Sequence, residues 1–197
     1  MGNRNESGYL KRFLDEYPMK KWPAHLDGGR VLNIGSANTK FNVFYEKIFS
    51  DRNILGVDLE KTDGVDVVCD ITKDCSELKG ERFAVAICCS VLEHVEKPWL
   101  AAENIQKLLL PFGLLYVTVP WVWRTHKYPK DYWRMSPDAI RSLFPHVKWK
   151  RICHSTQLEN EFIENESDHD QTAPWRIMHR GRAYIAVQQT HMIGRMS

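Results

Sequence analysis

The stretch that most restricts the possible folds runs from residue 82 to residue 90 and reads RFAVAICCS. Apolar and polar residues do not alternate in it, so it is too apolar for a strand with one face in water and is typical of one buried on both faces. Such strands occur in sheets whose two faces are covered by helices. The sequence therefore favours an α/β domain over an all-β sandwich or a helix bundle.

The rest of the chain fits this class, because strand and helix signals alternate along it without an internal repeat. Ser136 can cap a helix whose first turn accommodates Pro137. Helices are expected over 7–16, about 40–50, 100–109 and 136–144. Strands are expected over 30–35, 53–59, 65–71, 82–90 and 114–120, with 147–155 and 182–190 as a final antiparallel hairpin joined by a polar segment, 157–181.

Length and charge limit the domain number and the partners. The chain has 197 residues, 43% of them hydrophobic, which suits one compact α/β domain over 30–197 preceded by an N-terminal helix and connection over 1–29. Lys and Arg number 27 against 25 Asp and Glu, so no charge excess points to nucleic acid or to an anionic membrane surface. The charge balance leaves the oligomeric state open.

The chain carries no sequence signal for a membrane or for secretion. Its longest nearly apolar run, 108–123, has 16 residues and falls below the roughly 18 that a membrane span needs. The polar N-terminus does not resemble a secretory signal. We therefore expect no membrane partner and a cytoplasmic location.

The cysteines do not suggest a structural role. They are odd in number and form no CxxC pair, so we expect neither a disulfide framework nor a structural zinc site. His169, between Asp168 and Asp170, is a possible ligand cluster, but a solvated polar loop explains it better, and no metal site is expected. The five cysteines are Cys69, Cys75, Cys88, Cys89 and Cys153.

A ligand of a doubly wound sheet lies beyond the carboxyl ends of the strands. The expected strands end at Gly35, Asp58, Asp70 and Ser90. Gly35 lets the backbone pass close to a ligand, and the Asp58 carboxylate can accept hydrogen bonds from ribose hydroxyls. Asp70 can accept from an adenine amine while Ile71 packs on the ring. Taken singly, each residue also fits an ordinary turn or a solvated strand end.

Five segments in order over about 30–120 resemble the class I S-adenosylmethionine-dependent methyltransferases, in particular the group with a Leu-Glu-His-Val signature after the fourth strand. They read VLNIGSANTKF, ILGVDLE, VVCDI, FAVAICCSVLEHVEKPW and LLLPFGLLYVTVP. The resemblance implies a Rossmann-like, doubly wound sheet of seven strands with an antiparallel final strand, helices on both faces, and S-adenosylmethionine as cofactor. The cofactor-binding residues that we expect are Asn33, Gly35, Ser36, Asp58, Leu59, Asp70, Ile71, Cys89 and Ser90.

The first motif departs from the family pattern. Asn33 stands where the family has an acidic residue, which weakens a charge-assisted contact by about 1 kcal/mol. Ala37 and Thr39 replace glycines, so the turn must follow a path without positive φ at these positions. A non-catalytic binding protein of this fold is therefore an alternative. A nicotinamide-dependent oxidoreductase is a weaker one, because the turn lacks GxGxxG.

The aromatic loop 120–137 lies at the expected ligand end of the sheet. Its tryptophans and tyrosines either close the core as a lid or line a pocket for a small-molecule or sugar acceptor. Methyl transfer from a sulfonium is an in-line displacement, so the enzyme mainly aligns the acceptor with the methyl group. Arg124 and Arg134 can hold a carboxylate or phosphate. For a hydroxyl acceptor, the candidate bases are His126, Asp131 and, third, His94.

Overall fold

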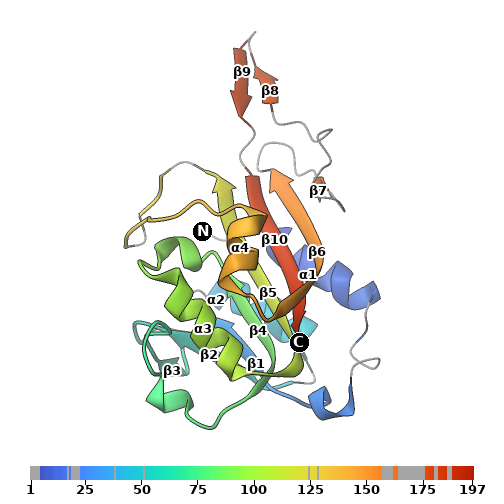
Figure 1. Ribbon diagram of the computed structural model, residues 1–197, viewed down its shortest axis with the longest axis vertical. Helices are drawn as coiled ribbons and strands as arrows, with labels where there is room; N and C mark the ends of the chain where they lie inside the picture. Colours follow the sequence, from blue (N-terminus) through green and yellow to red (C-terminus); the bar gives the residue numbers. More distant parts are fainter. Residues whose placement is uncertain are drawn as a thin grey trace.

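A computed structural model of the chain describes residues 5–16, 18, 23–37, 39–50, 52–123, 125–127, 129–156, 162–163, 176–179, 182–185 and 188–197 (Figure 1). The helices are α1 (Asn5–Glu16), η2 (Ala24–Leu26), α2 (Thr39–Ile48), η3 (Ser76–Leu78), η4 (Leu92–His94), α3 (Pro98–Leu108) and α4 (Pro137–Leu143). The strands are β1 (Val31–Ile34), β2 (Ile54–Asp58), β3 (Val67–Val68), β4 (Phe83–Cys89), β5 (Leu109–Val122), β6 (Val147–Thr156), β7 (Phe162–Ile163), β8 (Arg176–His179), β9 (Arg182–Ile185) and β10 (Gln188–Met196). Within the described residues, no helix is long and apolar enough to cross a membrane.

The central sheet has the strand order β3-β2-β1-β4-β5-β10-β6-β7. Strands β3, β2, β1, β4 and β5 pair in parallel, whereas β10 lies antiparallel between β5 and β6. The two-residue strand β7 only extends the edge of this sheet. If the other seven strands are numbered in chain order, so that β10 becomes strand 7, their order is 3-2-1-4-5-7-6 and strand 7 is antiparallel. The predicted doubly wound sheet of seven strands with an antiparallel final strand is confirmed.

Helices cover both faces of the sheet, as the apolar run 82–90 predicts (Figure 1). On β4, Val85 and Ile87 belong to one apolar cluster with residues of α1 and α2, and Ala86 and Cys88 to another with residues of α3 and α4. All four side chains are fully buried. Ser136 caps α4 as predicted, because its hydroxyl accepts a hydrogen bond from the Ala139 N–H.

The expected last strand, 182–190, is wrong. Residues 182–185 form β9, which pairs with β8 in a hairpin that projects beyond the central sheet, and the last strand of that sheet begins only at Gln188 (Figure 1). The segment reads RAYIAVQQT, and nothing in this composition indicates that the pairing partner changes within it. Partners are chosen by tertiary contacts that a local pattern does not contain.

Residues 111–113, which precede the expected strand 114–120, lie inside β5. Pairing with β4 jumps from Phe83–Leu109 to Val85–Leu114, and Phe112 takes a positive φ of 62°. This irregularity has the form of a bulge, in which extra residues on one strand interrupt the ladder without ending it. β3 is also shorter than its expected range, because only two of its residues pair with β2 at the sheet edge.

Candidate functional site

The turn after β1 is shaped by one glycine. Gly35 has φ +75° and is the only residue of the described turn 33–37 with a positive φ. The N–H groups of Gly35 and Ser36 donate to the Val57 carbonyl at 2.9 and 3.2 Å, which ties the turn to β2. A Cβ at position 35 would lie 2.4 Å from Val91 Cγ2. Gly35 therefore makes room for Val91, beside the Leu-Glu-His-Val segment, as well as for a backbone path that alanine avoids.

Asp58, at the end of β2, is bonded to the same turn. Its Oδ2 accepts from the Ala37 N–H at 3.1 Å and its Oδ1 from the Leu59 N–H at 2.7 Å. Each carboxylate oxygen can accept more than one hydrogen bond, so both can also accept from a ligand. The turn therefore makes this contact with Asp58 although Ala37 replaces a glycine of the family pattern. Asn33 and Ser36 place buried polar side chains beneath it.

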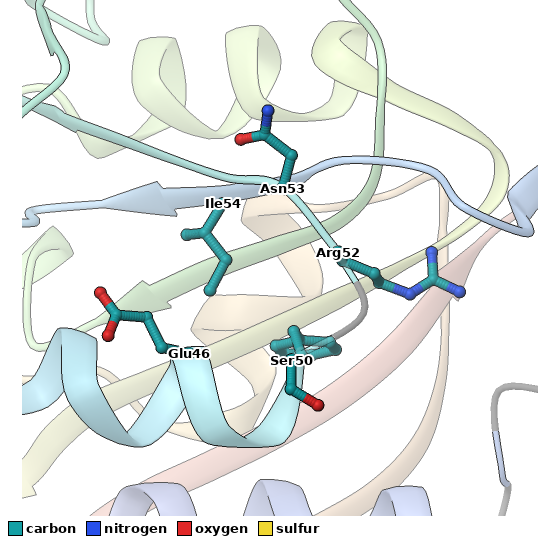
Figure 2. A pocket seen from close by; sticks show the side chains of 6 residues that line it. Glu46, Ser50, Arg52, Asn53 and Ile54 are labelled. Carbon is teal, nitrogen blue, oxygen red and sulfur yellow. The ribbon is translucent and has the colours of Figure 1, made fainter.

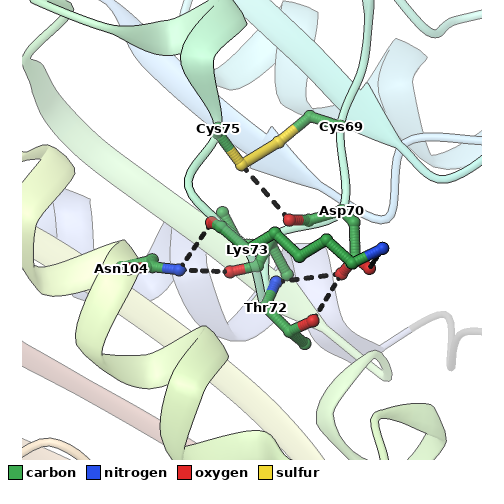
Figure 3. The surroundings of a disulfide bond; sticks show 7 residues. Cys69, Asp70, Thr72, Lys73, Cys75 and Asn104 are labelled. Atoms are coloured by element: carbon green, nitrogen blue, oxygen red, sulfur yellow. Dashed lines mark hydrogen bonds and ion pairs between the residues drawn. A yellow bond between two sulfur atoms is a disulfide. The ribbon is translucent and has the colours of Figure 1, made fainter.

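Asp70 follows β3 and is held by local hydrogen bonds (Figure 3). Its Oδ1 accepts from the Thr72 N–H at 3.0 Å and the Thr72 hydroxyl at 2.6 Å, and Lys73 Nζ lies 3.1 Å from Oδ2. Burial raises the pKa of Asp70, but the bonds from Thr72 and Lys73 outweigh it and lower the pKa below its usual value. Asp70 is therefore an ionised acceptor at neutral pH, next to the buried side chain of Ile71.

A disulfide between Cys69 and Cys75 closes the loop that carries Asp70 and Ile71 (Figure 3). The expectation that the cysteines form no disulfide is wrong for this pair. The loop folds back on itself and brings the two Cα atoms to 5.9 Å, which the sequence pattern did not indicate. Asn104 of α3 braces the same loop, donating to the carbonyls of Ile71 and Lys73 at 2.9 and 2.8 Å.

Cys89 and Ser90 end β4 at the same edge of the sheet. The Tyr45 hydroxyl donates to Cys89 Sγ at 3.1 Å, and the Ser90 N–H donates to the Thr118 carbonyl. Ser90 has φ +54°, a left-handed conformation that costs a residue with a side chain about 1 kcal/mol or more. Such residues cluster at functional sites, and this one directs the chain from β4 into η4.

The loop 120–137 is bound to η4 through backbone groups. The carbonyl of Glu93 accepts from the N–H groups of Tyr132 and Trp133 at 2.8 and 3.3 Å. His94 Nδ1 lies 2.5 Å from the carbonyl of Lys130. Since a carbonyl only accepts, Nδ1 carries the proton and the Nε2 of the neutral ring can accept a proton or bind an ion. The Glu93 side chain is 1% exposed.

Glu93 is the acidic residue of the Leu-Glu-His-Val signature and was not predicted as a site residue. An acidic residue between apolar neighbours, Val91, Leu92 and Val95, was the signal that could have identified it. A carboxylate in such a run is buried with the apolar side chains around it, and buried carboxylates are retained with partners or for function.

The three predicted base candidates lie together in the structure. The rings of His94 and His126 meet edge to face with centroids 4.8 Å apart. Asp131 Oδ2 lies 3.5 Å from His126 Nδ1 and accepts from the His126 backbone N–H at 2.7 Å. Burial and the neighbouring His94 lower the pKa of His126, outweighing the opposite effect of Asp131. The His126 ring is therefore neutral at physiological pH.

Asp131 pairs with Arg134 rather than serving as an available base. Arg134 Nη1 and Nη2 donate to its two carboxylate oxygens at 2.5 and 2.7 Å, and Nε donates to the Trp123 carbonyl. Hydrogen bonds from Arg134 hold the pKa of Asp131 far below its usual value, against burial. So strongly stabilised a carboxylate is a poor base. The guanidinium of Arg134, which was expected to hold a carboxylate or phosphate of the acceptor, is bonded to Asp131 instead.

Arg134→Gln is expected to lower the free energy of unfolding by about 2 kcal/mol. The Asp131 side chain is 4% exposed and would lose a bidentate partner, although the 25% exposure of Arg134 reduces the cost below that of a fully buried pair. Arg141→Gln is the matched control, since its partner Asp138 is 88% exposed and the pair contributes little. Urea unfolding measures both, and equal effects of the two changes would contradict the assigned role.

The same pair gives a pH dependence of known sign. The folded state lowers the pKa of Asp131 below 3.8, so its contribution to stability is complete above about pH 4 and is lost as the pH falls further. The loss should be smaller in Arg134→Gln, because the pKa of Asp131 then lies closer to its unfolded value. Thermal unfolding of the two proteins between pH 3 and pH 7 tests this, and parallel curves would contradict it.

Two aromatic residues of loop 120–137, Tyr132 and Trp133, are exposed and do not close the core. Trp133 is partly exposed and meets the exposed Trp99 of α3 edge to face at 6.4 Å between centroids, and its Nε1 donates to the Val95 carbonyl. Met135 anchors the loop in the core instead. Arg124, Tyr128, Asp168, His169 and Asp170 lie outside the described residues.

A separate pocket of about 320 Å³ lies at the amino end of β2, away from Asp58 (Figure 2). It is lined by Glu46, Phe49, Ser50, Arg52, Asn53 and Ile54. Arg52 Nη1 donates there to the carbonyls of Leu26 and Gly29, which fastens the segment before β1. Ligands of doubly wound sheets bind at the carboxyl ends of the strands, and this pocket adjoins the amino end of β2. We assign it no ligand.

Comparisons with known proteins are consistent with this arrangement. The family described as "Methyltransferase domain" matches residues 4–162. No curated protein sequence matches the chain. Solved structures that are 10–15% identical to the chain share its fold, and the likeness shows nothing finer.

Three of these structures illustrate the likeness. The N-methyltransferase NodS from Bradyrhizobium japonicum WM9, in complex with S-adenosyl-L-homocysteine, is 13% identical, with a TM-score of 0.58 over 96% of this chain and 86% of that one. A SAM-dependent methyltransferase from Archaeoglobus fulgidus is 12% identical, with a TM-score of 0.57 over 96% and 94%. The CurJ carbon methyltransferase is 15% identical, with a TM-score of 0.63 over 97% and 54%.

Proposed function

This chain belongs to the methyltransferase domain family, and from its membership among the S-adenosylmethionine-dependent methyltransferases we propose that it methylates a small molecule or a sugar whose reacting atom lies beside His94 and His126. The observation that carries the proposal is the meeting of the two imidazoles at the end of the sheet where Asp58, Asp70 and Ser90 also lie. Loop 120–137, fastened to η4, forms the wall on the acceptor side.

The residues at the strand ends fit S-adenosylmethionine. Asp58 has carboxylate oxygens that can accept from ribose hydroxyls while bonded to two backbone N–H groups. The ionised Asp70 and the apolar Ile71 suit the amine and the face of adenine. When bound, the cofactor supplies a methyl group on a positively charged sulfur. We assign the remaining contacts to Asn33, Gly35, Ser36, Leu59, Cys89 and Ser90.

Proton removal from a hydroxyl acceptor falls to the histidines. His126 is neutral at physiological pH because burial and His94 lower its pKa, so a ring nitrogen can accept a proton. His94 offers Nε2, since its Nδ1 donates to Lys130. Asp131 positions His126 through the backbone N–H and Arg134 holds Asp131. Asp131 is thereby a positioning residue in this proposal.

Of the two alternatives, the oxidoreductase is not supported by the family match, whereas the altered first turn still leaves cofactor affinity to be measured. Titration calorimetry should detect binding of S-adenosylmethionine and S-adenosylhomocysteine, and none of NAD or NADP. No binding of the first two at millimolar concentration would remove the proposed assignment of the strand-end residues.

His126→Gln tests the acceptor side of the proposal. We expect methyl transfer to fall about a hundredfold with unchanged affinity for S-adenosylmethionine, because the side chain acts on the acceptor and not on the cofactor. The acceptor is found first, by following radiolabelled methyl groups into a set of phenols, amines and sugars. Lys127→Gln, at an exposed neighbour, is the control. Equal rates in the two variants would show that His126 has no part in the reaction.

A further inference from the structure

Glu93, His94 and His126 form a cluster with the composition of a metal site. Each side chain offers one ligand atom, and the three atoms lie within 4.8 Å of one another. Two come from η4 after β4, and the third comes from the loop after β5. The chain therefore brings two imidazole nitrogens and a carboxylate oxygen to one point at the carboxyl end of the sheet.

The contacts around His94 resemble those of metal-bound histidines. Metal-ligating histidines usually donate their second ring N–H to a carbonyl or carboxylate, which fixes the tautomer and the direction of the ring. Here Nδ1 of His94 donates to the Lys130 carbonyl, and Nε2 lies 3.9 Å from Glu93 Oε1. The ring nitrogen that Lys130 does not engage is therefore the one that faces the cluster.

The other two residues are also held in place. The Glu93 carboxylate is 1% exposed, and its backbone carbonyl is bonded to the N–H groups of Tyr132 and Trp133. The His126 backbone N–H donates to Asp131, and its ring contacts His94 and lies 6.4 Å from Trp123. The Arg134 guanidinium also interacts electrostatically with the Glu93 carboxylate. A divalent cation at the centre of the cluster would add positive charge between this buried carboxylate and the two imidazoles.

We propose that Glu93, His94 and His126 bind a divalent transition-metal ion. Two imidazoles and one carboxylate are ligands found for Zn²⁺, Fe²⁺ and similar ions, whereas Mg²⁺ and Ca²⁺ prefer oxygen ligands. Ligand atoms bound at about 2.1 Å lie roughly 3 to 3.5 Å apart, so the side chains need to close by about 1 Å around the ion. Three protein ligands leave at least one position open.

The open position suits an oxygen of the acceptor, and this use of the site rests on the proposed function. A hydroxyl bound to a divalent ion has a lowered pKa and releases its proton to water. The imidazoles then act as ligands, and proton removal no longer requires them as bases. The acceptor class that the site would select is a hydroxyl or carboxylate compound, because soft or apolar groups bind such ions poorly.

Metal binding is tested directly, without cofactor or acceptor. The full chain is stripped with a chelator, dialysed, and titrated with Zn²⁺ by calorimetry and with Co²⁺ by visible absorption. We expect one equivalent to bind, and Glu93→Gln and His126→Gln each to weaken binding at least tenfold. His146→Gln, at an exposed histidine before β6, should bind as the wild type does.

Two results would overturn the proposal. One is a wild-type protein that binds no stoichiometric ion, which would leave only an ion pair or hydrogen bonds within the cluster. The other is equal affinity in His126→Gln and His146→Gln. The His126 side chain is 27% exposed, so its substitution tests the site even if a change at the buried Glu93 prevents folding.

The outcomes for the two proposals are separable. Failure to bind S-adenosylmethionine would count against the cofactor assignments and leave the metal titration unaffected. Failure to bind metal would leave cofactor binding intact and return proton removal to the imidazoles. A methyl-transfer rate that falls on chelation and recovers on adding Zn²⁺ or Mn²⁺ would support the use of the ion in the reaction.

Discussion

Asp58→Ala is expected to weaken the binding of S-adenosylmethionine at least tenfold. The change removes an acceptor for the ribose hydroxyls, whose hydrogen bonds contribute roughly 1.5–3 kcal/mol together. It also removes the carboxylate that accepts from the Ala37 N–H, so the turn after β1 loses one of its bonds to the end of β2. The first effect acts on the bound state and the second on the free protein as well, and calorimetry with S-adenosylmethionine and S-adenosylhomocysteine measures the combined change in affinity.

Two further variants distinguish the loss of hydrogen bonds to the ribose from the effect of removing a negative charge. Asp63→Ala removes an exposed carboxylate from the loop after β2 and should leave the affinity unchanged. Asp58→Asn keeps the shape and an oxygen acceptor, so its affinity should fall between those of the wild type and Asp58→Ala. If Asp58→Ala binds as tightly as Asp63→Ala, then Asp58 is not part of the cofactor site.

Gly35→Ala should destabilise the fold by about 2–3 kcal/mol, which corresponds to roughly 5–10 °C in the melting temperature of a chain of this length. A left-handed conformation costs an alanine about 1 kcal/mol or more. The new methyl group would also lie 2.4 Å from Val91 Cγ2, so the segment before Leu92 would have to shift. Because that segment leads into Glu93 and His94, methyl transfer should fall together with stability.

Gly80→Ala isolates the steric part of this effect. Gly80 has φ +86°, close to the φ of Gly35, but a Cβ there would meet nothing within 4 Å. Gly80→Ala should therefore lower the stability only by the free energy of holding an alanine in a left-handed backbone conformation. In Gly35→Ala/Val91→Ala the contacting methyl is removed, so the double variant should lose less than the sum of the two single changes. Equal melting temperatures for Gly35→Ala and Gly80→Ala would show that Val91 imposes no constraint.

Much of the fold could be predicted because buried parallel strands leave a strong local signal. The run 82–90 identified β4, and the segments around Ile34 and Asp58 identified its neighbours, so the sheet class, the family and the cofactor were predicted and are confirmed. The last strand was wrong because 182–190 contains two strands that pair with different partners. That choice depends on contacts with β5 and β6, which no local pattern encodes.

The candidate site could be predicted as a set of residue types but not as a set of contacts. His94, His126 and Asp131 were named as candidates, and the structure brings them together. The sequence could not show that Arg134 holds Asp131, which makes this carboxylate a poor base. Nor could it show that Gly35 faces Val91, since that contact joins residues 56 positions apart (91 − 35) in the chain.

The position of β10 has a consequence for how the protein is made. This strand follows β6 in the sequence, yet it lies between β5 and β6 and pairs with both of them. During synthesis, β5 and β6 therefore lack the strand that lies between them until residues 188–196 leave the ribosome. Pairing of distant segments is slow, and unpaired strand edges invite aggregation. We expect the nascent chain to depend on chaperones until β10 has emerged.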